Sequence, residues 1–167
     1  MVLTPSELIA SLQNEVRVLV HLTTKIDSSM LDYRPTPKQR STMELLRYLT
    51  LMGPSLTKAA KTGTFDVPAW TAAEQAANAR NFEQTVAELA SQHDTYAALL
   101  ADMTDEDFRA EIEMFGAKYT RGAFLVNLVL SGHAAYRTQL FLYLKGCGRE
   151  ELSTTNLWGG MDAPPKG

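Results

Sequence analysis

Cysteine, histidine and excess positive charge are all scarce in this 167-residue chain. The single cysteine, Cys147, cannot form an internal disulfide, which is typical of a protein from the reducing cytoplasm. No stretch approaches the roughly 18 uninterrupted apolar residues of a membrane helix, and we see no secretion signal, so we expect a cytoplasmic protein with no membrane partner. The net charge of −3 argues against nucleic acid as a partner, because phosphate binding needs clustered Lys and Arg.

Familiar catalytic motifs are also missing. The sequence has no Ser-His-Asp order, no phosphate-binding glycine loop and no paired-carboxylate motif, and its three scattered histidines make no metal signature. Cys147 has no base beside it, so we expect an inert turn residue. With 45% hydrophobic and 21% charged residues, the composition is that of one globular domain.

Helical periodicity dominates what is present. Three Ser or Thr residues are each followed by Glu three positions later, a capping box that opens helices. They are Thr4, Ser41 and Thr71. The spacing of apolar residues then predicts helices over four ranges. They are about 4–28, 41–61, 72–103 and 121–145. Four amphipathic helices predict an all-α four-helix bundle.

Interruptions in the pattern complete the expected organisation. Gly53-Pro54 predicts a kink in the second helix, and segment 65–70 is expected to be a loop. A short extended excursion around Gly116 is expected before the last helix. We expect residues 1–150 to form the bundle and 151–167 to form a tail that packs on it through Trp158.

The segment from Ser131 to Lys145 carries a recognisable pattern. Its residues Arg137, Gln139, Leu140, Tyr143, Leu144 and Lys145 match the last long helix of the DinB-like (damage-inducible) four-helix proteins, which the chain resembles. That family's signature is a histidine, three residues, then His-Arg-Gly-Gln-Leu leading into Tyr-Leu-Arg. The same register places Gly132 and Tyr136 at the two histidine positions. A second segment, Glu44-Leu-Leu-Arg-Tyr48-Leu49, resembles the family's Glu-Leu-Leu-x-His-Leu pattern and places Tyr48 at a third.

The resemblance implies a divalent metal held by three imidazoles, as in the family's thiol-dependent transferases and isomerases. Tyrosine, with a pKa near 10, is a poor ligand at neutral pH, and glycine has no side chain. We therefore expect no metal and no cofactor, and a pocket at Tyr48, Gly132 and Tyr136. The expected function is binding of a small molecule, or a stress-associated role, without metal-dependent catalysis. The alternative is a thiol-dependent S-transferase or isomerase, in which Tyr48, Tyr136 and His93 assist as acid and base.

Three further residues are candidate neighbours of this pocket: His93, His133 and Gln139. His93 falls on the predicted inner stripe of its helix, where it either lines the cavity or is a buried neutral histidine. His133 is one residue, or about 100°, from position 132, so a contact with another helix is favoured. A register that made His133 and Arg137 the ligand pair would lose the match at Gln139.

A homodimer is the expected oligomer. The resemblance implies it, and the last helix is apolar on more than one face. The residues off its main inner stripe are Phe124, Leu130, Phe141 and Leu144.

Overall fold

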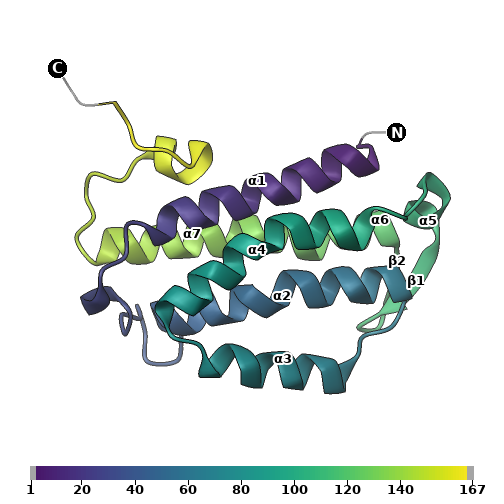
Figure 1. Ribbon diagram of the computed structural model, residues 1–167, viewed down its shortest axis with the longest axis horizontal. Helices are drawn as coiled ribbons and strands as arrows, with labels where there is room; N and C mark the ends of the chain where they lie inside the picture. Colours follow the sequence, from purple (N-terminus) through teal and green to yellow (C-terminus); the bar gives the residue numbers. More distant parts are fainter. Residues whose placement is uncertain (1–2, 165–167) are drawn as a thin grey trace.

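The computed structural model describes residues 3–164, which form an all-α bundle with one small hairpin, as the sequence predicts (Figure 1). The four bundle helices are α1 (Pro5–Thr23), α2 (Thr42–Thr62), α4 (Phe82–Leu100) and α7 (Ser131–Gly146). The last is preceded without a break by α6 (Arg121–Phe124) and a π-helical stretch, η2 (Leu125–Leu130). Helix α3 (Val67–Ala79) lies outside the bundle along α2. The short elements are η1 (Ser28–Met30), α5 (Asp105–Arg109) and η3 (Thr155–Gly159).

Local capping explains where the helices begin. The capping boxes at Thr4 and Ser41 are confirmed, since each side chain accepts a hydrogen bond from the backbone N–H three residues on. The prediction at Thr71 is wrong, because this residue lies inside α3, which Asp66 caps instead. The expected helix over 72–103 is therefore two helices, α3 and α4. Asn81 begins α4 with its own capping box, so the chain breaks just before it.

The first helix is also shorter than expected. It ends at Thr23, whose hydroxyl donates to the Val20 carbonyl, and Thr24 bonds in the same way to His21. Such side-chain bonds compete with the continuing helix. The chain then starts a separate 3₁₀ turn, η1, behind the side-chain cap of Asp27.

The extended excursion is a two-stranded hairpin. Strands β1 (Glu111–Met114) and β2 (Ala117–Thr120) pair antiparallel, with Met114 opposite Ala117. The two-residue turn is Phe115-Gly116, and both residues have positive φ, 54° and 78°. Figure 1 places the hairpin at the end of the bundle where α2 ends and α3 begins.

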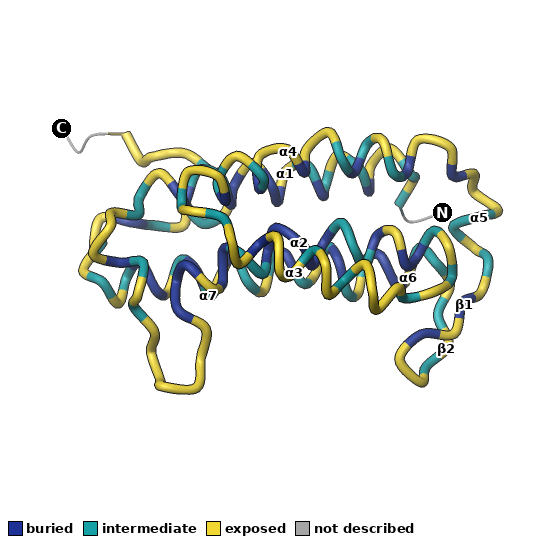
Figure 2. The backbone as a smooth tube through the Cα atoms, turned by 60° about the horizontal axis from the view of Figure 1, so that its bottom comes forward, coloured by how far each residue is buried: buried dark blue, intermediate teal, exposed yellow. Residues whose placement is uncertain are grey.

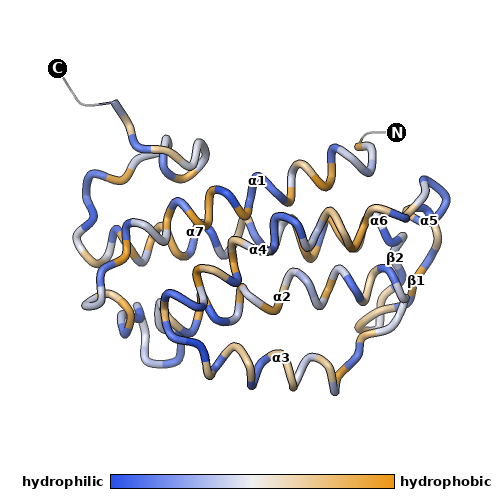
Figure 3. Tube along the Cα trace, in the orientation of Figure 1, coloured by the Kyte–Doolittle hydropathy of each residue, from blue (hydrophilic) through white to orange (hydrophobic). Residues whose placement is uncertain are grey.

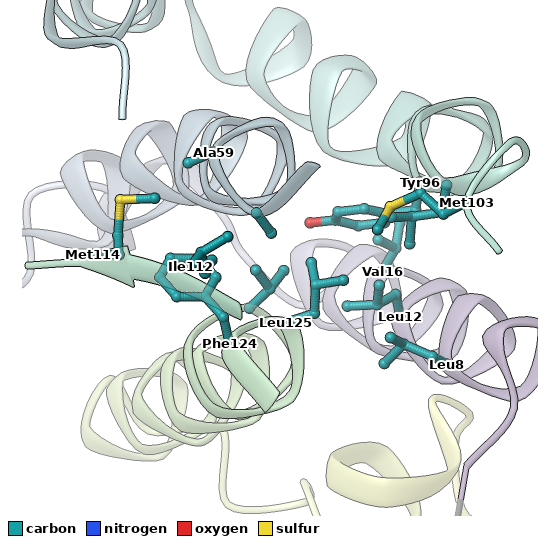
Figure 4. Close-up of a cluster of buried hydrophobic side chains, with 13 residues drawn as sticks. Leu8, Leu12, Val16, Ala59, Tyr96, Met103, Ile112, Met114, Phe124 and Leu125 are labelled. Carbon is teal, nitrogen blue, oxygen red and sulfur yellow. The ribbon is translucent and has the colours of Figure 1, made fainter. Parts of the chain in front are cut away.

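The inward faces of the four long helices form the core, and buried positions recur along each of them (Figure 2). Hydrophobic and hydrophilic residues likewise alternate along the helices (Figure 3). Figure 4 shows one part of this core, where Leu12, Tyr96 and Leu125 meet from three helices. Helix α2 continues through Pro54, and Gly53 is needed for packing: a Cβ there would overlap the Tyr96 hydroxyl and lie 2.7 Å from His133 Nε2.

The C-terminal tail lies against α1. Arg17 donates to the Gly159 carbonyl, and the buried Asn156 approaches His21 Nε2 at 3.1 Å. Trp158 is 66% exposed, and its ring lies 4.9 Å from the Arg137 guanidinium. The last residues of the expected tail, 165–167, lie outside the described residues. Between residues 3 and 164, no helix combines the length and apolarity needed to cross a bilayer.

Candidate functional site: an aromatic pocket between α2 and α7

The structure brings Tyr48, Gly132 and Tyr136 to the lining of one pocket, with a volume of about 630 Å³. The rings of Tyr48 and Tyr136 meet edge to face, with centroids 5.2 Å apart. A Cβ at Gly132 would lie 3.2 Å from Cε of Met52, which is one turn after Tyr48 on α2. Positions 48, 132 and 136 therefore face one another across the interface of two helices.

Three further aromatic residues extend this lining. The Trp70 ring stands edge-on to Tyr48 at 6.2 Å, and Phe65 lies 5.5 Å from Trp70. Phe115, at the tip of the β-hairpin, lies 5.3 Å from Phe65. We call the five rings of Tyr48, Phe65, Trp70, Phe115 and Tyr136 the aromatic wall. Each of its rings comes from a different element or connection, and each ring contacts the next.

The polar groups of the pocket are few and none is acidic. The lining contains Asn127 and Ser131 and no Asp or Glu. The Arg40 guanidinium lies 4.0 Å above the Tyr48 ring, a cation–π contact. Burial, and then hydrogen bonding with Tyr136, raise the pKa of Tyr48 to about 12. Its hydroxyl is therefore protonated at neutral pH.

A π-helical stretch borders the pocket on α7. Ser131 donates its hydroxyl to the Val126 carbonyl, five residues earlier, at 2.9 Å. Asn127, Leu128, Ser131 and Gly132 all line the pocket from this stretch and the following turn. Single π-helical turns occur often at functional sites, where they change the direction in which side chains project.

His133 and Arg137 face away from the pocket. His133 is fully buried and hydrogen-bonds the Tyr96 hydroxyl of α4, and burial lowers its pKa to about 4. Arg137 is buried against Glu15 of α1, with Nη1 and Oε1 3.1 Å apart. Residues 132 and 136 face α2, whereas residues 133 and 137 face α4 and α1.

His93 does not line the pocket, and the expectation that it is on an inner stripe is wrong. Its side chain is 53% exposed and pairs with Asp94. The buried face of α4 advances three residues from Leu89 to Gln92, not four to His93. Gln92 then donates to the Leu49 carbonyl of α2 at 2.8 Å.

Gln139 does not line the pocket either, but it supports one edge of it. Its amide donates to the Tyr143 hydroxyl, which donates to the backbone carbonyl of Arg40 at 2.9 Å. Because the Arg40 side chain lies on Tyr48, this chain of contacts links Gln139 to the aromatic wall. Arg40, Phe65, Trp70 and Phe115 carry no sequence signal that links them to the pocket, and none of them was among the predicted site residues.

The residues present do not fit a divalent metal. Within residues 3–164, no three His, Cys, Asp or Glu side chains come together in a group that could hold such an ion. The pocket offers phenols, one amide and one hydroxyl, and the Tyr48 phenol is held in its protonated form. Divalent transition metals in proteins favour imidazole, thiolate and carboxylate ligands.

Comparison with known proteins establishes the family. The sequence profile of the DinB superfamily matches residues 11–138, which include all three positions discussed above. The chain belongs to the DinB superfamily. The structure of a DinB-like protein, YjoA from Bacillus subtilis, is similar with a TM-score of 0.68 and 22% identity, over 87% of this chain and 94% of that one. At this identity the likeness shows a shared DinB fold. No curated protein matches this chain.

Proposed function

We propose that this DinB superfamily protein binds a small, largely apolar molecule in the aromatic pocket and carries out no metal-dependent reaction. The observation that carries the proposal is the meeting of Tyr48, Gly132 and Tyr136 in one pocket. The resemblance implies that Gly132 and Tyr136, from the pattern of the last helix, and Tyr48, from the Glu44–Leu49 segment, stand where the family has its metal-binding histidines. On this proposal two phenol rings, and the volume left open at Gly132, occupy the space of the three imidazoles.

The size and lining of the pocket support binding of an organic molecule. A volume of about 630 Å³ falls in the roughly 300–1,000 Å³ range of small-molecule sites. Such sites are mostly apolar and aromatic, with a few polar groups that fix orientation. Here Tyr48, Asn127 and Ser131 supply those groups. The Tyr48 phenol would donate a hydrogen bond to an acceptor atom of the ligand.

The alternative, a thiol-dependent transferase, has less support. A transferase without a metal would need a base to generate a thiolate at neutral pH. Tyr48, whose pKa is raised to about 12, is a poor base there. His93 is exposed on another face, and His133 is buried against Tyr96. Binding without turnover is therefore the function we favour.

Two tryptophan substitutions on α7 test the proposal. Ala135 is exposed and lines the pocket, so Ala135→Trp should fill it. Thr138 is exposed on the same helix but does not line the pocket, so Thr138→Trp is the matched control. We expect native mass spectrometry of untagged protein to detect a bound organic molecule in the parent and in Thr138→Trp, and none in Ala135→Trp. Equal retention by both variants would contradict the proposed site.

A homodimer is also part of the proposal, but two of the four residues of the last helix that were expected to contact a partner cannot do so. Phe124 and Leu144 are fully buried inside the chain, so they are not free to contact a partner. Leu142, which is 59% exposed, is the apolar residue that α7 presents outward.

A further inference from the structure

The tip of the β-hairpin holds a residue that folding alone does not favour. In a two-residue hairpin turn with positive φ at both positions, Asn, Asp and Gly are preferred. Gly116 fits its position, and a Cβ there would meet no atom within 4 Å. Phe115 has φ of 54°, a conformation that is unusual for a bulky side chain. It is also 61% exposed, so the ring has a free surface.

The Phe115 ring is part of the pocket lining. It meets Phe65 edge to face and stacks with Phe124, with ring centroids 6.3 Å apart. Strained backbone conformations in proteins cluster at binding and catalytic sites. The strain at Phe115 keeps an aromatic ring at the hairpin end of the aromatic wall.

The charges around the pocket limit which ligands can bind in it. Its lining has no carboxylate to pair with a cation. The Arg40 guanidinium already covers the Tyr48 ring, and it repels a second positive charge. Aromatic rings favour a flat ring as partner, because edge-to-face and offset contacts add to the gain from burial alone.

We infer that the pocket takes a planar aromatic molecule that carries no positive charge, and that Phe115 is the specificity-determining residue that holds it from the hairpin tip. The inference rests on the proposed function and adds the ligand class and the residue that selects it. A flat ring bound along the aromatic wall would contact Tyr48 and Trp70, and it would contact Phe115 at the hairpin end.

Calorimetric titration with four probes tests the ligand class. They are 2-naphthol, 2-naphthoate, 2-naphthylmethylammonium and the aliphatic alcohol 1-decanol. We expect 2-naphthol and 2-naphthoate to bind one per chain, at least about tenfold more tightly than the other two, which corresponds to about 1.4 kcal/mol. Equal affinity for the alcohol or the ammonium probe would overturn the ligand class. If none of the four binds, the proposed function fails together with the inference.

Phe115→Asn tests the residue, with Leu142→Gln as a control. Leu142 is similarly exposed, at 59%, and does not line the pocket. We expect Phe115→Asn to weaken 2-naphthol binding about tenfold while its melting temperature stays the same or rises, because Asn suits the turn. Leu142→Gln should leave binding unchanged.

Three results with these variants would overturn the inference and leave the proposed function standing. The first is binding by Phe115→Asn as tight as that of the parent. The second is a loss of binding accompanied by a fall of several degrees in melting temperature, which would give Phe115 a structural role. The third is a change of oligomeric state in Phe115→Asn with unchanged binding, which would mean that a second copy of the chain covers this ring.

Discussion

Replacing Gly53 with alanine tests the packing that separates the pocket from the buried histidine. In an ordinary helix interior this change stabilises a protein by roughly 0.5–1 kcal/mol, because glycine has more conformational freedom to lose. At this position the new Cβ would overlap the Tyr96 hydroxyl and lie 2.7 Å from His133 Nε2. Both atoms belong to one buried hydrogen bond, so the sign of the effect should reverse.

The expected size follows from two costs. Overpacking a core costs about 1–3 kcal/mol, and a buried polar group that loses its partner costs about 1–3 kcal/mol. Set against the helix gain, the net destabilisation should be about 3 kcal/mol. For a chain of this length that corresponds to a fall in melting temperature of about 6–12 °C. The assays are calorimetric melting and urea titration of parent and variant at the same pH.

Two further variants make the test specific. In a Tyr96→Phe background the overlapping hydroxyl is gone, so the penalty of Gly53→Ala should shrink by about 1 kcal/mol. Gly132→Ala is the control, because its Cβ would approach only the flexible end of Met52, at 3.2 Å, and stability should stay the same or rise by up to about 1 kcal/mol. A Gly53→Ala protein as stable as the parent would refute this account of the core.

Three other predictions follow from the same geometry. The pKa of His133 is about 4 in the folded protein and near 6.5 in the unfolded chain. The free energy of unfolding should therefore fall as pH drops from about 6.5 to 4, by up to about 3 kcal/mol. Urea titrations across this pH range should show a smaller fall for His133→Gln than for the parent. The combined change Tyr48→His, Gly132→His and Tyr136→His should create a nickel or zinc site that calorimetry detects, and its absence would contradict the register of the last helix. Light scattering at tens of micromolar should give the mass of a homodimer, and a monomer would exclude it.

The helices could be predicted where local chemistry is strong. Thr4 and Ser41 carry complete capping boxes, and the structure has helices at both. Thr71 carries the same pattern, yet Asp66 opens the helix five residues earlier. Asn81 and Gln84 form the box that starts α4, and this amide version of the motif is harder to recognise than Ser or Thr followed by Glu. Farther along α4, the buried position between Leu89 and Tyr96 is Gln92 and not His93.

The pocket could be predicted only in part. The register of the last helix points to Gly132 and Tyr136, because i and i+4 residues share a face whatever the loops do. Tyr48 was indicated by the resemblance of the segment Glu44–Leu49 to a second pattern of the family. The rest of the aromatic wall depends on tertiary placement. Trp70 lies in the first turn of α3, where the sequence predicts a loop, and Phe115 lies in a hairpin turn. No local pattern shows that these rings meet beside α2 and α7.

The central claim is that positions 48, 132 and 136 form a site for an organic molecule and not for a metal ion. The most direct test is a map of backbone amide NMR shifts as 2-naphthol and, separately, Ni²⁺ are added to the parent protein. The account predicts saturable shifts from 2-naphthol centred on residues 48–52 and 127–136, and no localised paramagnetic broadening there with Ni²⁺. Broadening by stoichiometric Ni²⁺ centred on those residues, with no shifts from 2-naphthol, would contradict it.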